Sequence, residues 1–466
     1  MRLESKWLLY ILKVNDFITD KDLSEILKKI KDETDFTNTI KAVFDFKLSS
    51  FNSKEDAEQF SSLLNQAKEL ALEKANELQE PPESFILSKE QKSVEIDLSV
   101  IESKDKSKIS SLIRNLLKEY KSQGASDLHI CANASLFVRK DLAIKLIDNI
   151  IISKDQVETI VSSLLNARQL EILKVDKTIS FALSFGNTER YRVTILHNKD
   201  GLSIAFHIVS EKIKTFQELG FSKSNIDTID YFFSFHNGLI LVTGPIGSGK
   251  TTSLATFVDS INKKRTDHIL MIENPIEIVQ ESIKCNVTQR EIFQHTQSYA
   301  NAIKASLRED PDIIVIGELN DLETIEIAIK ASETGHLVIG TLQTSDVTNT
   351  LSRIINTFPS FQQPQIKSML STSLRGIICQ RLLPKKGGGT VLATEILSNN
   401  LAVANTITEG KLFLLKSIMQ TASKSGMSSM DASIFDFFNQ GLITKETALL
   451  NIIDKKNYGK LIESAK

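Results

Sequence analysis

Cysteine is scarce in this sequence of 466 residues, and no apolar run approaches the length of a membrane span. Cys131, Cys285 and Cys379 lie far apart, so they form neither the C-x-x-C pair of a zinc site nor a disulfide framework. We expect them to be small buried residues in a reducing compartment. The apolar stretch WLLYILKV near the N-terminus is much shorter than the roughly 20 residues of a spanning helix, so we expect neither a signal peptide nor a membrane span. The sequence therefore predicts a cytoplasmic protein that reaches a membrane only through partners.

An excess of charge of either sign is also missing. The chain has 56 Lys and Arg residues against 58 Asp and Glu residues, which gives a formal net charge of -2. Such a balance creates no overall field that would draw the chain onto nucleic acid. We therefore expect no nucleic-acid partner, and a DNA-pumping motor remains a disfavoured alternative that needs a local basic patch.

The N-terminal part of the sequence divides into three predicted segments. Residues 1–79 form a helical domain, because AEQFSSLLNQAKELALEKANEL carries apolar residues at the spacing of an amphipathic helix. Residues 80–108 begin with EPPES, continue with many lysines and serines, and are predicted to be a linker. Residues 109–212 combine a helix with short strand-like runs such as RYRVTIL, which predicts a small α+β domain.

Residues 213–400 show a different pattern. The apolar runs LILVTG, HILMIE, IIVIGEL and HLVIGTL alternate with helical stretches, which is typical of a parallel sheet covered on both faces. Residues 401–466 are predicted to be a C-terminal helical subdomain. The predicted fold class is therefore α/β, with a smaller α+β domain and a helical N-terminal domain added to it.

The stretch GPIGSGKTT matches G-x-x-x-x-G-K-[ST], the pattern of a phosphate-binding loop. It lies between a buried strand and the start of a helix, where backbone N–H groups converge on phosphates and the helix dipole favours their charge. We expect Lys250 to neutralise the terminal phosphates and Thr251 to bind Mg²⁺. The predicted nucleotide-binding residues here are Gly244, Pro245, Gly247, Ser248, Gly249, Lys250, Thr251 and Thr252.

Cleavage of a bound nucleotide also requires carboxylates beside the metal and the attacking water. Glu318 follows one apolar run, and Glu273 and Glu277 follow another, so we expect all three at the carboxyl edge of the same sheet as the loop. A single glutamate at such a place is as often a helix cap or a solvent-facing residue. Three of them around a phosphate-binding loop favour a catalytic cluster.

Several motifs together resemble the type II and type IV secretion ATPase family, and most of all its PilT branch of pilus-retraction motors. The shared stretches are ASDLHI, GPIGSGKTTS, ENPIE, LREDPDIIVIGEL, ETGHLVIGTL and RLLP with the glycine run after it. The resemblance covers residues from about 110 to 455. It implies a PAS-like α+β domain joined to a RecA-like ATPase domain, a hexameric ring of this chain, and ATP bound between domains and neighbouring subunits.

The resemblance also implies roles for individual residues. Lys250 and Thr251 belong to the Walker A loop and Glu318 to Walker B, with Thr251 and Glu318 holding Mg²⁺. Glu273 and Glu277 fall in the aspartate box, where Glu277 takes the place of the catalytic glutamate.

Three more residues receive roles in the same way. His336 is the first histidine of the histidine box, which places it among the catalytic residues. Arg190 and Arg192 in RYRVTIL match arginines that reach the ATP phosphates from the small domain, a task that suits the fixed fork of the guanidinium. The alternative for each is a surface residue on an amphipathic strand.

The sequence departs from the family pattern around the γ-phosphate. The family's EDPIE, GEMRD and GTLHT are changed at one position each, the further small-domain arginines expected after RYRV are replaced, and the C-terminal AIRNLIREGK has lost both arginines. The substituted residues are Asn274, Asn320, Gln343, Lys199 or Asp200, His207, Ala404 and Thr408. Because arginines that meet transition-state charge contribute about 10³–10⁵ in rate, we expect slow turnover, and a weakly or non-hydrolysing paralogue that regulates an active motor is an alternative.

Two features bear on the role of the motor. The chain lacks the four-cysteine zinc module of many extension and type II secretion members, which favours retraction. Residues 1–79 nevertheless resemble the helical domain by which extension ATPases dock on a membrane platform protein, so an extension or secretion motor is a further alternative. The expected partners are other copies of the chain, an inner-membrane platform protein and a paralogous pilus ATPase.

Overall fold

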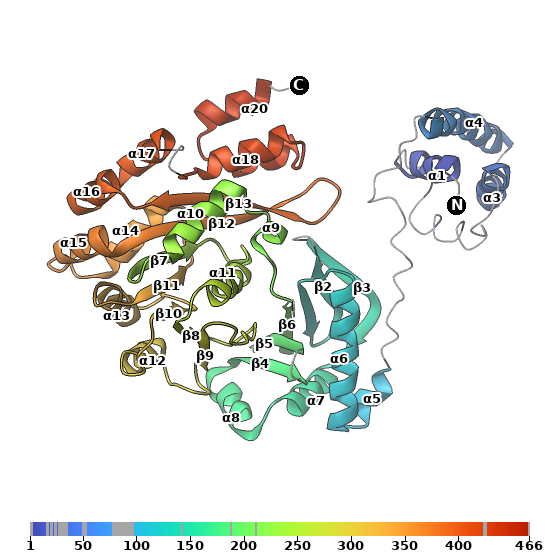
Figure 1. The fold of residues 1–466 in the computed structure, drawn as a ribbon. Coiled ribbons are helices and arrows are strands. Elements are labelled where there is room, and N and C mark those ends of the chain that lie inside the picture. Colours follow the sequence, from blue (N-terminus) through green and yellow to red (C-terminus); the bar gives the residue numbers. More distant parts are fainter. Residues whose placement is uncertain are drawn as a thin grey trace. The chain divides into compact units, whose positions relative to one another are not determined.

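The computed structural model describes residues 3–14, 18, 22, 26, 36–48, 54–76, 97–140, 143–186, 189–209, 212–422 and 426–464. The chain forms two compact units, Met1–Ser93 and Val94–Lys466 (Figure 1). Most of the predicted linker, up to residue 96, lies outside the described residues, whereas the chain is helical from Leu98. None of the described helices has an apolar stretch long enough to cross a bilayer.

The first unit contains the helices α1 (Leu3–Val14), α3 (Phe36–Leu48) and α4 (Lys54–Asn76). Their apolar faces pack together into a small core. Phe60, Leu64, Ala67 and Ala71 of the predicted stripe on α4 are buried in this core, whereas Leu70 is 49% exposed. The 3.6-residue period thus corresponds to a real buried face.

The second unit begins with an antiparallel sheet. Its elements are α5 (Leu98–Glu102), α6 (Lys106–Ser122), β1 (Asp127–Cys131), β2 (Ala134–Lys140), β3 (Ala143–Ile152), α7 (Lys154–Leu164), α8 (Ala167–Asp176), β4 (Thr178–Phe185), β5 (Glu189–Asn198) and β6 (Gly201–Ile208). The strand order is β3-β2-β1-β6-β5-β4. Tyr191 and Val193 of β5 point into the core that α6 and α7 cover, so Arg190 and Arg192 share the opposite face.

A second, larger sheet follows. Its elements are α9 (Phe216–Leu219), α10 (Lys223–Phe233), β7 (Gly238–Thr243), α11 (Lys250–Lys264), β8 (His268–Glu273), β9 (Asn286–Glu291), α12 (Tyr299–Ser306), β10 (Ile313–Ile316), α13 (Leu322–Glu333), β11 (Leu337–Leu342), α14 (Val347–Thr357), α15 (Gln363–Ser373), β12 (Leu374–Pro384) and β13 (Thr390–Ser398). The strand order is β13-β12-β7-β11-β10-β8-β9. All neighbouring strands are parallel except the edge strand β13, which is antiparallel to β12.

Helices cover both faces of this sheet (Figure 1). The apolar residues of α9, α10 and α11 pack on one face, and those of α12 to α15 pack on the other. The second layer continues into the C-terminal helices α16 (Leu401–Glu409), α17 (Leu415–Thr421), α18 (Met430–Asn439), α19 (Lys445–Asn451) and α20 (Lys460–Ser464). The nearly continuous apolar strands are those of a sheet buried on both sides, which confirms the predicted fold class.

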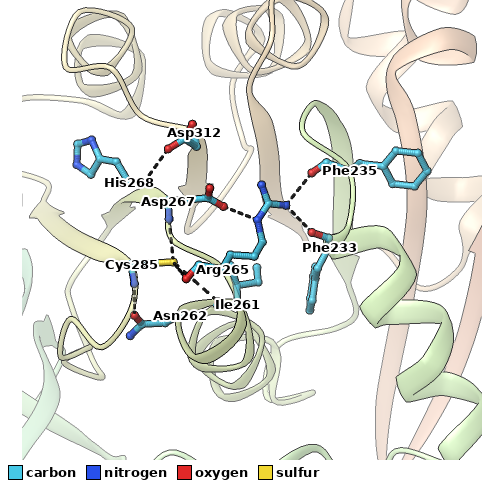
Figure 2. Close-up of polar contacts among 9 residues, drawn as sticks. All are labelled: Phe233, Phe235, Ile261, Asn262, Arg265, Asp267, His268, Cys285 and Asp312. Carbon is cyan, nitrogen blue, oxygen red and sulfur yellow. Dashed lines mark hydrogen bonds and ion pairs between the residues drawn. The ribbon is translucent and has the colours of Figure 1, made fainter.

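Polar side chains connect the segments at the amino edge of the larger sheet (Figure 2). Arg265, after α11, forms an ion pair with Asp267 and donates hydrogen bonds to the backbone carbonyls of Phe233 and Phe235. The thiol of Cys285 accepts a hydrogen bond from the Asp267 N–H at 3.4 Å. Cys285 and Cys379 are buried, as expected from the sequence, and Cys131 is half-buried.

A buried carboxylate joins the C-terminal helices to the sheet. Glu395 on β13 accepts hydrogen bonds from the N–H of Val347 at 2.8 Å and from the N–H of Met430 at 3.3 Å. Val347 and Met430 are the first residues of α14 and α18, so one side chain satisfies two helix N-termini. Burial raises the pKa of Glu395 despite these two bonds.

Candidate active site

The carboxyl ends of five neighbouring parallel strands meet at one edge of the larger sheet. The 244–249 loop follows β7, Gln343 follows β11, and Glu318 lies just beyond β10. Glu273 ends β8 and Glu291 ends β9. Open α/β sheets bind ligands at this edge, and most of the predicted site residues lie there.

The loop at the end of β7 has the geometry of a phosphate cradle. Gly244, Gly247 and Gly249 have φ values of 155°, 76° and 84°. A Cβ atom on Gly244 would lie 2.3 Å from the carbonyl oxygen of Gln380, so this position accepts only glycine. Gly249 precedes α11 and has no side chain that could cap the helix. No capping side chain therefore competes with a phosphate for the first N–H groups of α11. The hydroxyl of Ser248 is buried and has no hydrogen-bond partner among the described residues.

Lys250 folds over this cradle. Its ammonium group donates hydrogen bonds to the carbonyl oxygens of Gly244 at 2.8 Å and Pro245 at 2.9 Å. Burial lowers the pKa of Lys250, and the nearby charge of Glu318 partly offsets this effect. Glu318 therefore lies within electrostatic reach of the loop, where its carboxylate and the half-buried Thr251 in the first turn of α11 suit a Mg²⁺ ion bound with phosphates.

Two uncharged side chains interact with Glu318, one through a hydrogen bond and the other through the charge of the carboxylate. The side-chain amide of Gln343, at the end of the neighbouring strand β11, donates a hydrogen bond to the Glu318 carboxylate. Tyr299 begins α12, and burial together with the charges of Glu318, Glu273 and Glu277 raises the pKa of its phenol. The phenol therefore remains protonated at neutral pH.

Two arginines of the small sheet reach a cluster of buried carboxylates. Glu273, Glu277 and Glu291 are 6%, 7% and 6% exposed. Arg192 Nη1 lies 2.6 Å from Glu277 Oε1, and Arg190 Nη2 lies 3.5 Å from Glu291 Oε2. The alternation of β5 puts both guanidinium groups on the side that meets the larger domain.

Among the described residues, Glu273 forms no ion pair with an arginine. Burial, and to a lesser degree the charges of Glu277 and Glu291, raises its pKa to about 8, although the Gln289 amide donates a hydrogen bond to it at 2.8 Å. At neutral pH Glu273 therefore holds a proton. The other two carboxylates of the cluster, Glu277 and Glu291, each face a guanidinium group.

We predict that Glu273→Gln changes how stability depends on pH. The pKa of Glu273 is raised to about 8 in the folded chain from an ordinary value of 4.5, so the folded state binds the extra proton between these values. The wild type therefore loses stability as pH rises through this window, whereas glutamine has no proton to lose. Urea unfolding at pH 6 and pH 8 should give a larger midpoint decrease in the wild type than in the variant. Equal decreases would show that Glu273 is ionised throughout this range.

The structure separates His336 from these residues. His336 precedes β11, and its carbonyl accepts a hydrogen bond from the N–H of Gly238, the first residue of β7. Its ring Nδ1 lies 3.3 Å from the carbonyl oxygen of Ala331. It therefore lies at the amino edge, whereas Gln343 marks the carboxyl end of the same strand. Within the chain, His336 is not brought to the carboxylate cluster.

The other predicted positions lie around the loop or on the small sheet. Pro245 lies within the 244–249 loop, Thr252 lies in the first turn of α11, and Asn274 and Asn320 are exposed near the strand ends. His207 pairs with Asp127 at 2.9 Å on the small sheet and lies beside Arg192 in the β5–β6 register. The residues that sequence reasoning missed are Glu291, Gln289, Gln380 and Tyr299. The run NVTQRE did contain a signal, since two polar side chains two residues apart share one face of a strand.

Comparisons with known proteins give a consistent result. The family model described as "Type II/IV secretion system protein" matches residues 102–409. The chain is 38% identical over 336 residues to the "Type IV pilus retractation ATPase PilT" of Pseudomonas aeruginosa, a match that covers 72% of this chain and 96% of that protein. It is 40% identical over 297 residues to a "Twitching motility protein" of Neisseria gonorrhoeae, which covers 64% of this chain and 78% of that protein.

A solved structure agrees with these sequence matches. The crystal structure of the pilus retraction motor PilT with bound ADP superposes with a TM-score of 0.64 at 39% sequence identity. The match covers 74% of this chain and 98% of that one.

Proposed function

This chain belongs to the family of type II/IV secretion system proteins, and on that premise we propose that it is an ATP-hydrolysing motor that retracts a type IV pilus. The family expected from the motifs is thereby confirmed. The observation that carries the proposal is the arrangement at one sheet edge. The phosphate cradle with Lys250, the carboxylate of Glu318 and the buried Glu277 lie at the ends of strands β7, β10 and β8 of a single sheet.

Each residue of the site has a separate role in the proposed hydrolysis of ATP. The cradle and Lys250 bind the phosphates of ATP, and Thr251 and Glu318 hold Mg²⁺, which would offset charge on the γ-phosphate. Glu277 accepts a proton from the attacking water, as a general base at the end of a strand. Glu273, which keeps its own proton at neutral pH, cannot share this task and instead limits the negative charge around Glu277.

Arg190 and Arg192 connect hydrolysis to movement. Both arginines contact the Glu277-bearing loop from the small sheet. We expect them to transfer to the ATP phosphates when a site closes between subunits, and to return to the carboxylates after hydrolysis. Such an exchange moves the small domain relative to the ATPase domain once in each cycle. His336 has no place in this scheme within one chain.

The assembly follows from the same proposal. We infer a hexameric ring of this chain at the cytoplasmic side of the inner membrane, attached through a platform protein and able to work beside a paralogous pilus ATPase. The proposed domain organisation keeps the segments 1–79, 109–212, 213–400 and 401–466, but the linker predicted at 80–108 is shorter than expected, because α5 begins at Leu98 and α6 at Lys106. The first unit, with α1, α3 and α4, is an added docking module in this arrangement.

The departures around the γ-phosphate bear on rate rather than on binding. Gln343 holds the Glu318 carboxylate through its amide, but an amide cannot carry a proton as histidine can. Asn274 and Asn320 add no charge near the strand ends. We therefore propose a motor that hydrolyses ATP slowly. The alternative is a regulatory paralogue, which would hydrolyse ATP weakly or not at all.

The proposed function predicts two results. The purified full chain should release phosphate from ATP in steady state, and chelation of Mg²⁺ should abolish this release. In the bacterium that makes this chain, cells that lack it should still display fluorescently labelled pili, but those pili should extend without shortening. Absence of pili would assign the chain to extension, and normal shortening would exclude retraction. ATP binding without phosphate release would support the regulatory paralogue.

A further inference from the structure

Strand β9 braces the loop that carries Glu277. Glu291 Oε2 accepts a hydrogen bond from the N–H of Ile276 at 3.1 Å, and Ile276 immediately precedes Glu277. On the same face of β9, the side chain of Gln289 accepts a hydrogen bond from the N–H of Gln280 at 2.8 Å. The same amide donates to the carbonyl oxygen of Ile278 at 3.0 Å. Two side chains of one edge strand therefore hold the backbone on both sides of Glu277.

Arg190 joins this brace from the small sheet. Its Nε donates a hydrogen bond to the carbonyl oxygen of Ile276 at 3.1 Å, and its Nη2 lies 3.5 Å from Glu291 Oε2. Both polar backbone groups of Ile276 are thus held, the N–H by Glu291 and the carbonyl by Arg190. Because Glu291 and Arg190 also contact each other, the three residues form a closed ring of contacts.

The chemical identity of Glu291 is informative. Its side chain is 8% exposed and lies among the other buried acids, so its negative charge opposes the ionisation of Glu273. A neutral amide would accept the Ile276 N–H without that repulsion, as Gln289 does for Gln280. Unlike an amide, a carboxylate can also form an ion pair with Arg190. Arg190 belongs to the small domain, which moves in the proposed cycle.

We propose that Glu291 is a positioning residue for hydrolysis, which sets the direction of the Glu277 carboxylate through the Ile276 peptide and links that direction to the position of Arg190. The inference rests on the proposed function, because it assigns Glu277 as the general base. Glu291 itself touches neither nucleotide nor water in this scheme. A change at Glu291 therefore acts on the rate of the chemical step and not on the affinity for ATP.

The kinetic test uses the full-length chain and two variants. Glu291→Gln keeps an acceptor for the Ile276 N–H but removes the charge, and Glu291→Ala removes both. We expect kcat to fall by about 10-fold in the first and about 10²-fold in the second, with KM for ATP unchanged. Glu281→Gln, at an exposed position between β8 and β9, is the matched control and should behave as the wild type. Equal kcat values in wild type and Glu291→Ala would overturn the proposal.

Hydrogen exchange gives a second readout that does not depend on turnover. In Glu291→Ala the Ile276 N–H loses its acceptor, so exchange in the 274–279 segment should become at least about 10-fold faster. Exchange in α11 should stay at its wild-type rate, and this comparison also shows that the variant is folded. Unchanged exchange in the 274–279 segment would overturn the positioning role even if kcat fell.

The two tests separate the possible failures. If the wild type releases no phosphate, the proposed function fails, and the exchange result still decides whether Glu291 holds the loop. If the wild type is active and both Glu291 variants match it, the proposed function stands and the inference fails. A rise in KM with constant kcat would place Glu291 in ATP binding and would likewise contradict the inference.

Discussion

Replacement of Glu277 by glutamine is expected to lower the rate of ATP hydrolysis by about 10²–10⁴-fold. Glutamine has nearly the same shape and keeps an oxygen that can accept the hydrogen bond from Arg192, which lies 2.6 Å from Glu277 in the wild type. It cannot accept a proton from water, so the loss should fall on kcat. Affinity for ATP should stay close to the wild-type value, because Lys250 and the cradle lie at the end of another strand. Phosphate release and titration with a fluorescent ATP analogue measure the two quantities.

The control for this prediction is chosen from the same stretch of chain. Glu281→Gln makes the same chemical change at an exposed position four residues away, so its turnover should equal that of the wild type. A Glu277→Gln protein that hydrolyses ATP at the wild-type rate would remove Glu277 from the general-base role. In that case the ion pair with Arg192 would be a structural contact between the two domains.

Lys250→Ala is expected to impair ATP binding, the step that precedes hydrolysis. The Lys250 ammonium is held over the cradle by the carbonyls of Gly244 and Pro245, and alanine removes the only formal positive charge that the loop sequence carries. Loss of one charged partner in a buried contact weakens binding by about 10²-fold or more. We therefore expect both ATP binding and phosphate release to be lost at ordinary ATP concentrations.

Lys263→Ala provides the comparison for this second variant. Lys263 lies in the last turn of the same helix, with a side chain that is 57% exposed, so its removal tests for a general effect of charge on α11. We expect ATP binding by Lys263→Ala to match the wild type. Wild-type affinity in Lys250→Ala would mean that nucleotide binds elsewhere. Glu277→Gln and Lys250→Ala thus separate chemistry from binding.

Part of this site could be predicted because its chemistry is local in the sequence. The cradle is a contiguous motif, and Glu318 and Glu277 follow apolar runs whose carboxyl ends must meet in a parallel sheet. The sheet itself was predictable for the same reason, since its strands are short apolar runs between helices. The salt bridge from Arg192 to Glu277 was not, because it joins residues 85 positions apart on two different domains.

The brace on β9 was missed for a physical reason. NVTQRE has no apolar run, since β9 is an edge strand that is exposed at Asn286, half-buried over residues 287–290 and buried only at Glu291. What Glu291 does depends on Ile276 and Arg190, which come close only after two domains have folded and met. His336 shows the opposite case. It precedes the apolar run LVIGTL, so its place at the amino edge follows from the sequence, and its role in the histidine box stays a prediction.

The position of Glu395 determines how stiffly the C-terminal helices are joined to the rest of the molecule. Apolar contacts are non-directional and allow neighbouring helices to slide, whereas a hydrogen bond weakens steeply when its angle changes. The carboxylate of Glu395 holds the first residues of both α14 and α18, and α14 directly follows the loop that starts with Gln343. A force applied to α18 is therefore transmitted to that loop with little relative displacement of the two helices. In mechanical terms, Glu395 is a low-compliance joint between the C-terminal helices and the part of the chain that faces Glu318.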